Sequence, residues 1–249
     1  MTQKLIRIGQ IVPSSNTTME TEIPAIFRAR ESIEPERFSF HSSRMRMLKV
    51  TKEELEEMDN QSLRCAAELA DARMDVMGYA CLVAIMSRGN GYHNTAEKNL
   101  IAASRENNCD ASIVTSAGAL CEALHDLGAR KVALIAPYMR PLTNLVIEYL
   151  AAEGIETLDS ISLEIDDNLE VGARDPLALV DIFQDLKTDG ADAVVLSACV
   201  QMPSLAAVDR VQAMTDLPVV TSSISTAYVM MKRLGLKTVA PGAGKLLSA

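Results

Sequence analysis

Two cysteines stand in closely similar surroundings and are the residues best suited to chemistry. Cys81 follows an apolar run in "GYACLVAIMSRG" (78–89), and Cys199 does the same in "VVLSACVQMPS" (194–204). A thiol between a buried strand and a helix N-terminus is activated when the unpaired N–H groups stabilise its thiolate. A lone cysteine at such a place is more often a small buried hydrophobe. Duplication of the motif favours a paired catalytic role for Cys81 and Cys199.

The remaining cysteines and the histidines show no chemical pattern. Cys65, Cys109 and Cys121 lie within or near amphipathic helical patterns and are interpreted as structural. Five cysteines without CxxC or Cys/His spacing indicate free thiols in a reducing compartment, so we expect a cytoplasmic protein. The three histidines share no spacing either. The sequence therefore predicts neither a disulfide framework nor a metal site.

Composition narrows the classes of partner. The chain of 249 residues carries 24 basic and 33 acidic side chains, a formal charge of -9, which disfavours nucleic acid and anionic membranes. No apolar stretch reaches the roughly 20 residues that cross a bilayer, and the N-terminal residues do not resemble a signal peptide. There is no GxGxxG, and "PGAGKLL" lacks the spacing of a phosphate loop. We expect a small-molecule ligand and no cofactor.

Short apolar runs alternate with helical patterns along the whole chain, which is typical of parallel α/β sheets with helices on both faces. The clearest helix follows Thr51, which forms a capping box with Glu54. Its predicted apolar stripe consists of Leu55, Met58, Leu63, Ala66 and Leu69. Strands are expected at 5–12, 37–43, 74–80, 111–115, 131–136, 157–165, 192–198 and 218–222.

An internal repeat divides this pattern. "RIGQIVPSSNTTMETEIPAI" from Arg7 resembles "KVALIAPYMRPLTNLVIEYL" from Lys131, and each half reaches its cysteine at a similar distance after the proline. We predict two similar α/β lobes, 1–110 and 111–218, related by a pseudo-two-fold axis. Residues 219–249 are a candidate for packing back on the first lobe.

Ligands of open parallel sheets lie beyond the carboxyl ends of the strands. Both cysteines and both turns that follow the prolines map there, so we predict the active site between the lobes. Backbone N–H groups and the side chains of Ser14, Ser15, Asn16 and Tyr138 are suited to binding the carboxylates of a small planar dianion.

Taken together, "VPSSNTTMETE", "GYACLVAIMSRG" and "SACVQMPS" resemble the maleate isomerase family of the aspartate/glutamate racemase superfamily, over nearly the whole chain. The resemblance implies a two-lobed, cofactor-independent enzyme that is usually a homodimer. It implies that Cys81 is the nucleophile and Cys199 its partner. It further implies that Asn16, Tyr138 and Asn168 contact the substrate carboxylates. From the residues alone, Asn168 in "DDNLEVG" would be interpreted as a helix cap.

The implied chemistry is the conversion of maleate to fumarate, in which a thiolate adds to the double bond, the resulting single bond rotates, and elimination follows. Cys199 either protonates the carbanion or orients the intermediate. The nearest alternative is an amino-acid racemase that uses two thiols as acid and base, although neither motif offers a neighbouring carboxylate or imidazole. A decarboxylase would need one thiol only. A non-catalytic dicarboxylate-binding protein is a further alternative.

Overall fold

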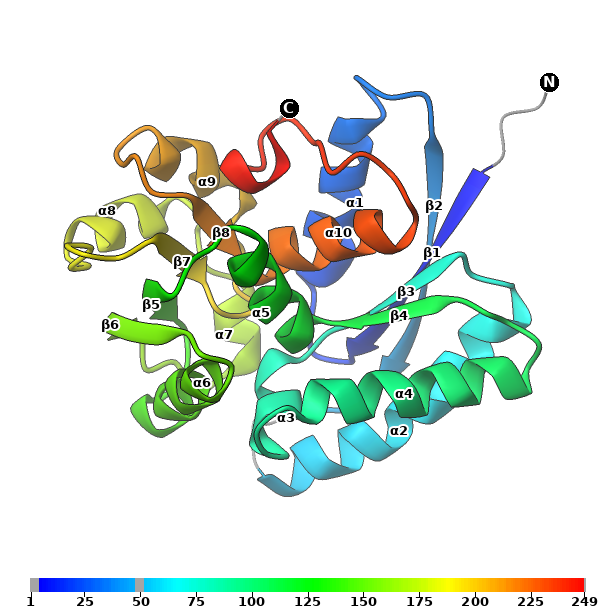
Figure 1. Cartoon of the computed structure of the whole chain (residues 1–249). Helices are drawn as coiled ribbons and strands as arrows, with labels where there is room; N and C mark the ends of the chain where they lie inside the picture. Colours follow the sequence, from blue (N-terminus) through cyan, green and yellow to red (C-terminus); the bar gives the residue numbers. More distant parts are fainter. Residues whose placement is uncertain (1–4, 48–51, 249) are drawn as a thin grey trace.

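A computed structural model describes residues 5–47 and 52–248, which form two parallel sheets of four strands each (Figure 1). The first sheet has the order β2-β1-β3-β4 and the second β6-β5-β7-β8. The two orders are equivalent strand for strand, and the predicted pair of similar α/β lobes is confirmed. The strands are β1 (Leu5–Pro13), β2 (Arg37–Met45), β3 (Val76–Tyr79), β4 (Ser112–Thr115), β5 (Lys131–Ala136), β6 (Glu156–Ser162), β7 (Ala193–Ser197) and β8 (Val219–Thr221).

All eight strands form where apolar runs were found. The central strands are buried on both faces, as in "VMGY" of β3 and "AVVLS" of β7, because helices cover both sides of each sheet. β1 pairs with β2 from Leu5↔Arg37 to Pro13↔Met45 and with β3 from Ile8↔Val76 to Ile11↔Tyr79. The carboxyl ends of β1 and β3 therefore open side by side toward the second lobe.

Helices cover both faces of the first sheet (Figure 1). One face packs against α2 (Lys52–Asp71) and α4 (Tyr92–Glu106), and the other against α1 (Met19–Arg30) and α10 (Ser222–Arg233). The predicted helix after Thr51 is thus α2, although Thr51 and its capping box lie outside the described residues. The predicted stripe of α2 is wrong at Leu63, which is 42% exposed. Ser62 is buried in its place, four residues after the buried Met58, as the helical period requires.

The second sheet is flanked by α6 (Arg140–Ala152), α8 (Ala178–Gln184) and α9 (Leu205–Gln212), while α7 (Asn168–Gly172) lies near the gap between the lobes (Figure 1). α3 (Leu82–Ser87) contacts α2 and α4 of the first lobe and α6 of the second. α5 (Ser116–Asp126) packs against α10. A final 3₁₀ turn, Lys245–Leu247, contacts α10 and β8.

Two segments show where the chain passes from one lobe to the other. β4, which the predicted boundary placed in the second lobe, pairs with β3 in the first sheet, from Val76↔Ser112 to Tyr79↔Thr115. β8 pairs with β7 in the second sheet, but the helix that follows it, α10, packs on β3, β4 and α1. The chain thus crosses between the lobes at both places, and the boundary itself stays a prediction.

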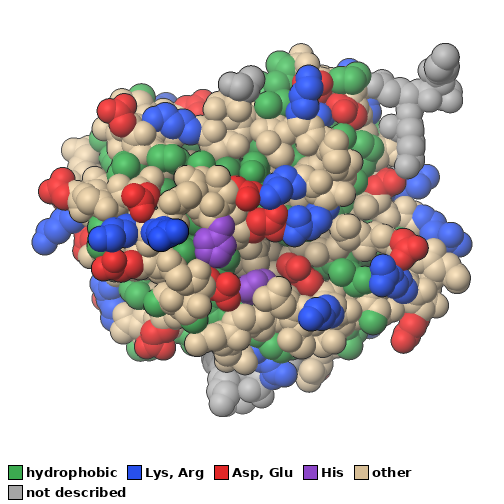
Figure 2. All heavy atoms as spheres, viewed as in Figure 1, with side chains coloured by type: hydrophobic (Ala, Val, Ile, Leu, Met, Phe, Trp, Pro, Cys, Tyr) green, Lys and Arg blue, Asp and Glu red, His purple; other side chains and the backbone are tan. Residues whose placement is uncertain are grey.

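On the face seen in Figure 2, acidic and basic side chains are interspersed, and neither sign of charge gathers in one large patch. Among residues 5–47 and 52–248, no helix is long and apolar enough to cross a membrane. Within the same ranges, no three His, Cys, Asp or Glu side chains come together as a metal-binding group.

Candidate active site

Cys81 lies at the junction of β3 and α3 in a backbone conformation that L-residues rarely adopt. Its φ of 110° and ψ of 86° fall in the region that favours glycine, and it occupies the N-cap position of α3. Such a conformation costs on the order of 1–3 kcal/mol and persists only where the surroundings enforce it. The N–H groups of Val83 and Ala84 lie near the Cys81 sulfur, although the Cys81 side chain makes no capping hydrogen bond to α3. A strained residue with its thiol at a helix N-terminus is the arrangement expected of a nucleophile.

Burial governs the acidity of this thiol. It raises the pKa of Cys81 to about 12, against the lowering effect of the nearby Ala84 and Val83 N–H groups. The nearby Cys199 and Asp59 raise the pKa further. Cys81 is therefore a thiol in the free protein, and its proton must leave as the sulfur attacks.

A polar network lies behind the Cys81 turn. The hydroxyl of the buried Tyr79, two residues before Cys81, donates to Asp59 Oδ1 at 3.3 Å, and that of Tyr92 donates to Oδ2 at 2.6 Å. Arg88, at the end of α3, places its Nε 3.7 Å from the same Oδ2. Asp59 belongs to α2, so the network connects α2 to β3, to the end of the short α3 and to the start of α4.

Cys199 occupies the equivalent turn after β7 and is buried. Burial raises the pKa of the Cys199 thiol, while hydrogen bonds from the Tyr138 hydroxyl and the N–H groups of Gln201 and Met202 lower it. The Gln201 nitrogen lies 3.4 Å from the sulfur. Burial and the two thiols keep the pKa of Tyr138 well above its usual value, so this phenol remains a donor. Cys199 is thus a protonated thiol with donors already in place for its thiolate.

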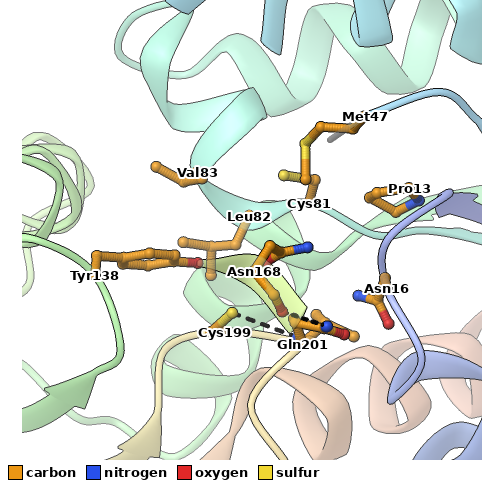
Figure 3. A pocket seen from close by; sticks show the side chains of 11 residues that line it. Pro13, Asn16, Met47, Cys81, Leu82, Val83, Tyr138, Asn168, Cys199 and Gln201 are labelled. Carbon is orange, nitrogen blue, oxygen red and sulfur yellow. Dashed lines mark hydrogen bonds between the residues drawn. The ribbon is translucent and has the colours of Figure 1, made fainter. Parts of the chain in front are cut away.

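One cavity brings the two thiols together (Figure 3). The space between its walls, about 330 Å³, includes some of the solvent at its mouth. In Figure 3, Cys81 lies above it, Cys199 and Gln201 below, Tyr138 at one end and Asn16 at the other. No charged side chain is found among the described residues that line it, which are Pro13, Asn16, Met47, Cys81, Leu82, Val83, Tyr138, Asn168, Cys199, Val200 and Gln201. A dianion would be held here by amides, a phenol and backbone N–H groups.

Asn16 lies at one end of the cavity and caps a helix. Its Oδ1 accepts hydrogen bonds from the N–H groups of Thr18 and Met19, both at 2.9 Å, and so caps the N-terminus of α1. These bonds fix the orientation of the amide, and Figure 3 shows its nitrogen directed toward the cavity. The capping and binding interpretations of Asn16 are therefore compatible, because they use different atoms.

Asn168 is held in the cavity wall from two sides. Asp167, not Asn168, caps α7, since its Oδ1 accepts from Leu169 N at 2.7 Å and from Glu170 N at 3.3 Å. The Asn168 side chain is therefore free to cross to the first lobe, where its Nδ2 donates to Ser15 Oγ at 2.7 Å. Ser15 is buried behind Asn168 and does not belong to the residues that line the cavity.

Ser14 was predicted to bind substrate, but it does not line the cavity. It is exposed, and its Oγ accepts from Met47 N at 3.0 Å and donates to Met47 O at 3.2 Å. Ser14 thereby fixes the backbone of Met47, whose side chain reaches into the cavity (Figure 3). The cavity thus joins Cys81, Cys199, Asn16, Tyr138 and Asn168, with Ser14 and Ser15 one layer behind.

Sequence reasoning missed Met47 and Gln201. Gln201 lies two residues after Cys199 in the motif "SACVQMPS", and a buried amide at that distance from a reactive thiol was the available signal. Met47 follows a strand, and nothing in the surrounding sequence indicates that it lines a site. The interpretation of Cys65, Cys109 and Cys121 as structural agrees with their burial away from the cavity.

Comparisons with known proteins agree with this geometry. The model of the arylmalonate decarboxylase family matches residues 8–247. A maleate isomerase of Geobacillus stearothermophilus is 60% identical over 246 residues, which cover 98% of each chain. A solved maleate isomerase from Pseudomonas putida S16, with maleate, is 56% identical with a TM-score of 0.97 over 98% of each chain. A Nocardia farcinica maleate cis-trans isomerase with a covalently bound succinylcysteine intermediate is 42% identical, with a TM-score of 0.94 over 98% of each chain.

Proposed function

Because this chain belongs to the maleate isomerases of the arylmalonate decarboxylase family, we propose that it converts maleate to fumarate through a covalent adduct on Cys81. The observation that carries the proposal is the presence of two thiols, Cys81 and Cys199, in one cavity lined by neutral hydrogen-bond donors. The succinylcysteine of the Nocardia farcinica relative supports the same route.

Addition and elimination account for every atom. The Cys81 sulfur bonds to one alkene carbon and passes its proton to solvent at the mouth of the cavity, and the π electrons move to the other carbon and onto its carboxylate. The former double bond becomes a single bond and rotates. Elimination then re-forms the double bond in the trans geometry and returns the sulfur, which regains its proton. Since no electrons are gained or lost, we propose that the reaction needs no cofactor.

We propose that Cys199 supplies the proton that the carbanion accepts. Its thiol can protonate the carbanion and later take the same proton back, because the thiolate left behind is stabilised by Tyr138 and by the N–H groups of Gln201 and Met202. The charge that moves onto the carboxylate during addition is met by preorganised donors. We assign this role to the amides of Asn16 and Asn168 and to the Tyr138 hydroxyl, with Ser14 and Ser15 as their supports.

Two further assignments rest on other grounds. The five free cysteines support a reducing compartment, and we propose the cytoplasm. The resemblance to a family of usually dimeric enzymes supports a homodimer.

The test is to mix the protein with maleate in deuterium oxide, with a chelator and without cofactor, and to follow the alkene proton signals by NMR. Fumarate should appear with little deuterium, because Cys199 is shielded from water, and Cys81→Ala should form none. In parallel samples, aspartate and glutamate should keep their α-protons. Unchanged maleate together with enzyme-dependent α-deuteration of an amino acid would replace the isomerase by the two-thiol racemase. Dicarboxylate binding without turnover would indicate a binding protein.

A further inference from the structure

Gln201 is the most heavily bonded side chain in the cavity wall. It is 4% exposed, and its primary amide uses all of its hydrogen-bonding groups on the backbone of other segments. Its Oε1 accepts from Thr17 N at 2.9 Å, and its Nε2 donates to Ser15 O at 3.0 Å and to Asn168 O at 2.8 Å. Buried amides are usually satisfied, but here every partner belongs to a carboxylate-binding segment.

The partners of Gln201 bracket Asn16. The Ser15 carbonyl precedes Asn16 and the Thr17 N–H follows it, so one amide holds the backbone on both sides of the residue. The third bond holds the backbone of Asn168, the other amide that reaches the cavity. A single side chain therefore fixes the separation between Asn16 on the first lobe and Asn168 on the second.

The backbone of the same residue reaches the second thiol. Gln201 N lies 3.4 Å from Cys199 Sγ, and Gln201 O accepts from Thr18 Oγ1 at 2.6 Å. Figure 3 shows the bonds from Gln201 to Cys199 and to Asn168 side by side at the floor of the cavity. The position of Cys199 is thereby set relative to the amides.

We propose that Gln201 is a positioning residue that locks Cys199, Asn16 and Asn168 into one geometry across the two lobes, so that a dicarboxylate is bound with its alkene between the thiols. This rests on the proposed function. A structural role alone predicts lower stability with unchanged substrate affinity, whereas the positioning role predicts weaker binding by correctly folded protein.

Gly172 supplies an independent means of moving Gln201. A Cβ at Gly172, the last residue of α7, would lie 2.4 Å from Gln201 Nε2, 3.0 Å from its Cδ and 3.0 Å from Thr17 Oγ1. The backbone of Gly172 is not in the glycine-only region, so this glycine is required for space. Gly172→Ala should displace the Gln201 amide without replacing any residue that lines the cavity.

The chain also contains a matched control. Gln212 has the same bonding pattern far from the thiols, since its Nε2 donates to Thr215 O at 3.1 Å and Leu217 O at 2.8 Å, and its Oε1 accepts from Val219 N at 3.1 Å. Replacing either glutamine by glutamate keeps the shape of the side chain. It puts a carboxylate oxygen in place of the Nε2 that donates to two backbone carbonyl oxygens, so attraction is replaced by repulsion. Both substitutions should lower stability, but only Gln201→Glu should change binding.

The experiment compares wild type, Gln201→Glu, Gly172→Ala and Gln212→Glu. It measures KM and kcat for maleate, the Kd for succinate, a saturated dicarboxylate that cannot isomerise, and the urea midpoint. Gln201→Glu and Gly172→Ala should weaken succinate binding and raise KM roughly tenfold, the loss expected for misplacing one or two buried hydrogen-bond donors. Gln212→Glu should keep both values within about twofold of wild type, as expected if no binding contact is lost.

A double variant tests whether Gly172 acts through Gln201. In a Gln201→Ala background the amide is gone, so Gly172→Ala should add no further loss of succinate affinity. The proposal is overturned if Gln201→Glu and Gly172→Ala bind succinate like wild type, if Gln212→Glu weakens binding equally, or if the two losses simply add. If Gln201→Glu does not fold, the decision rests on comparing the effect of Gly172→Ala in wild type with its effect in the Gln201→Ala background. Wild type that binds succinate but leaves maleate unchanged would refute the isomerase and not the positioning role.

Discussion

The carboxylate of Glu22, on α1 of the first lobe, accepts the backbone N–H of Ser204 at 2.5 Å, at the start of α9 in the second lobe. It also accepts Leu205 N at 2.6 Å and Ser204 Oγ at 3.2 Å. A helix N-terminus in one lobe is thus capped by an anion from the other, in a buried setting where both the hydrogen bonds and the helix dipole favour the charge. This contact joins the lobes beside the turn that carries Cys199.

Removing this cap should destabilise the whole chain. Glu22→Ala removes the partner of the buried Ser204 N–H and of the partly buried Leu205 N–H, and we expect the free energy of unfolding to fall by about 2–3 kcal/mol. Urea denaturation followed by circular dichroism measures the change. Glu156→Ala is the control, because the exposed Glu156 only faces Lys131 at 3.8 Å, and its loss should cost less than about 0.5 kcal/mol. Equal effects of the two substitutions would remove the capping argument.

The adduct should be visible on Cys81. After rapid acid quench with maleate, intact-protein mass spectrometry should show one added maleate, mapped to Cys81 by peptide analysis. Cys199→Ala should increase the trapped fraction, because an adduct protonated by water then has no thiolate to remove the proton and start elimination. Cys121→Ala, in the buried face of α5, should behave as wild type. Normal turnover by Cys81→Ala without an adduct would exclude covalent catalysis at this residue.

The positive φ of Cys81 predicts a conflict between stability and activity. Cys81→Gly and Cys81→Ala should both be inactive, but the glycine variant should be more stable by about 1 kcal/mol, because glycine adopts this conformation without steric cost. Thermal denaturation of the two variants measures the difference. A more stable alanine variant would mean that the backbone relaxes when the thiol is removed.

One substitution can separate the capping role of Asn16 from its proposed contact with the substrate. Asn16→Asp keeps the oxygen that caps α1 and replaces the nitrogen facing the cavity by a second oxygen, which repels a carboxylate. We expect unfolding free energy within about 0.5 kcal/mol of wild type and a KM raised at least roughly tenfold. Asn16→Ala should lose both the cap and the contact. An Asn16→Asp variant with normal KM would leave Asn16 only its capping role.

Stability should fall in alkaline solution as unfolded thiols ionise. Burial and the charge of Glu153 raise the pKa of Cys121 to about 12, from 9.0 for an unperturbed thiol. Between these values the unfolded state has lost the proton that the folded state keeps, so the free energy of unfolding decreases by about 1.4 kcal/mol per pH unit for this thiol. Cys121→Ala should reduce the slope between pH 9 and 12 by that amount. An identical slope in both proteins would show that Cys121 titrates normally when folded.

Local sequence patterns were sufficient to predict where the strands form and which two thiols share the cavity. Apolar runs fix where a buried strand forms, and the parallel topology then brings the turns after β1, β3, β5 and β7 to one place. Cys81, Cys199, Asn16 and Tyr138 meet in the cavity for that reason, and each could be predicted from its position after an apolar run. Asn168 could be named only through the resemblance, because by itself it resembles a cap.

What the sequence did not reveal depends on contacts between distant segments. β4 pairs with β3 of the first sheet and not with β5, which follows it in the chain after α5, and nothing in "ASIVT" specifies that partner. Gln201 is as ordinary in the sequence as Gln212, and its importance comes from bonds to residues more than 180 positions away in the chain, which only the packed lobes create. Leu63 shows the same limit on a smaller scale, since helix phase is set by the neighbours that α2 meets.

The neutral lining of the cavity has a kinetic consequence. A dianion approaches a protein whose formal charge is -9, and no cation among the described residues of the cavity wall attracts it. Long-range forces therefore slow the encounter, in contrast to enzymes that use basic clefts to capture anions. Because dissolved ions screen repulsion beyond about 10 Å at 0.1 M, added salt should accelerate capture of maleate. The recognition of negative charge begins only at contact, where directional hydrogen bonds can tell a cis dicarboxylate from other anions.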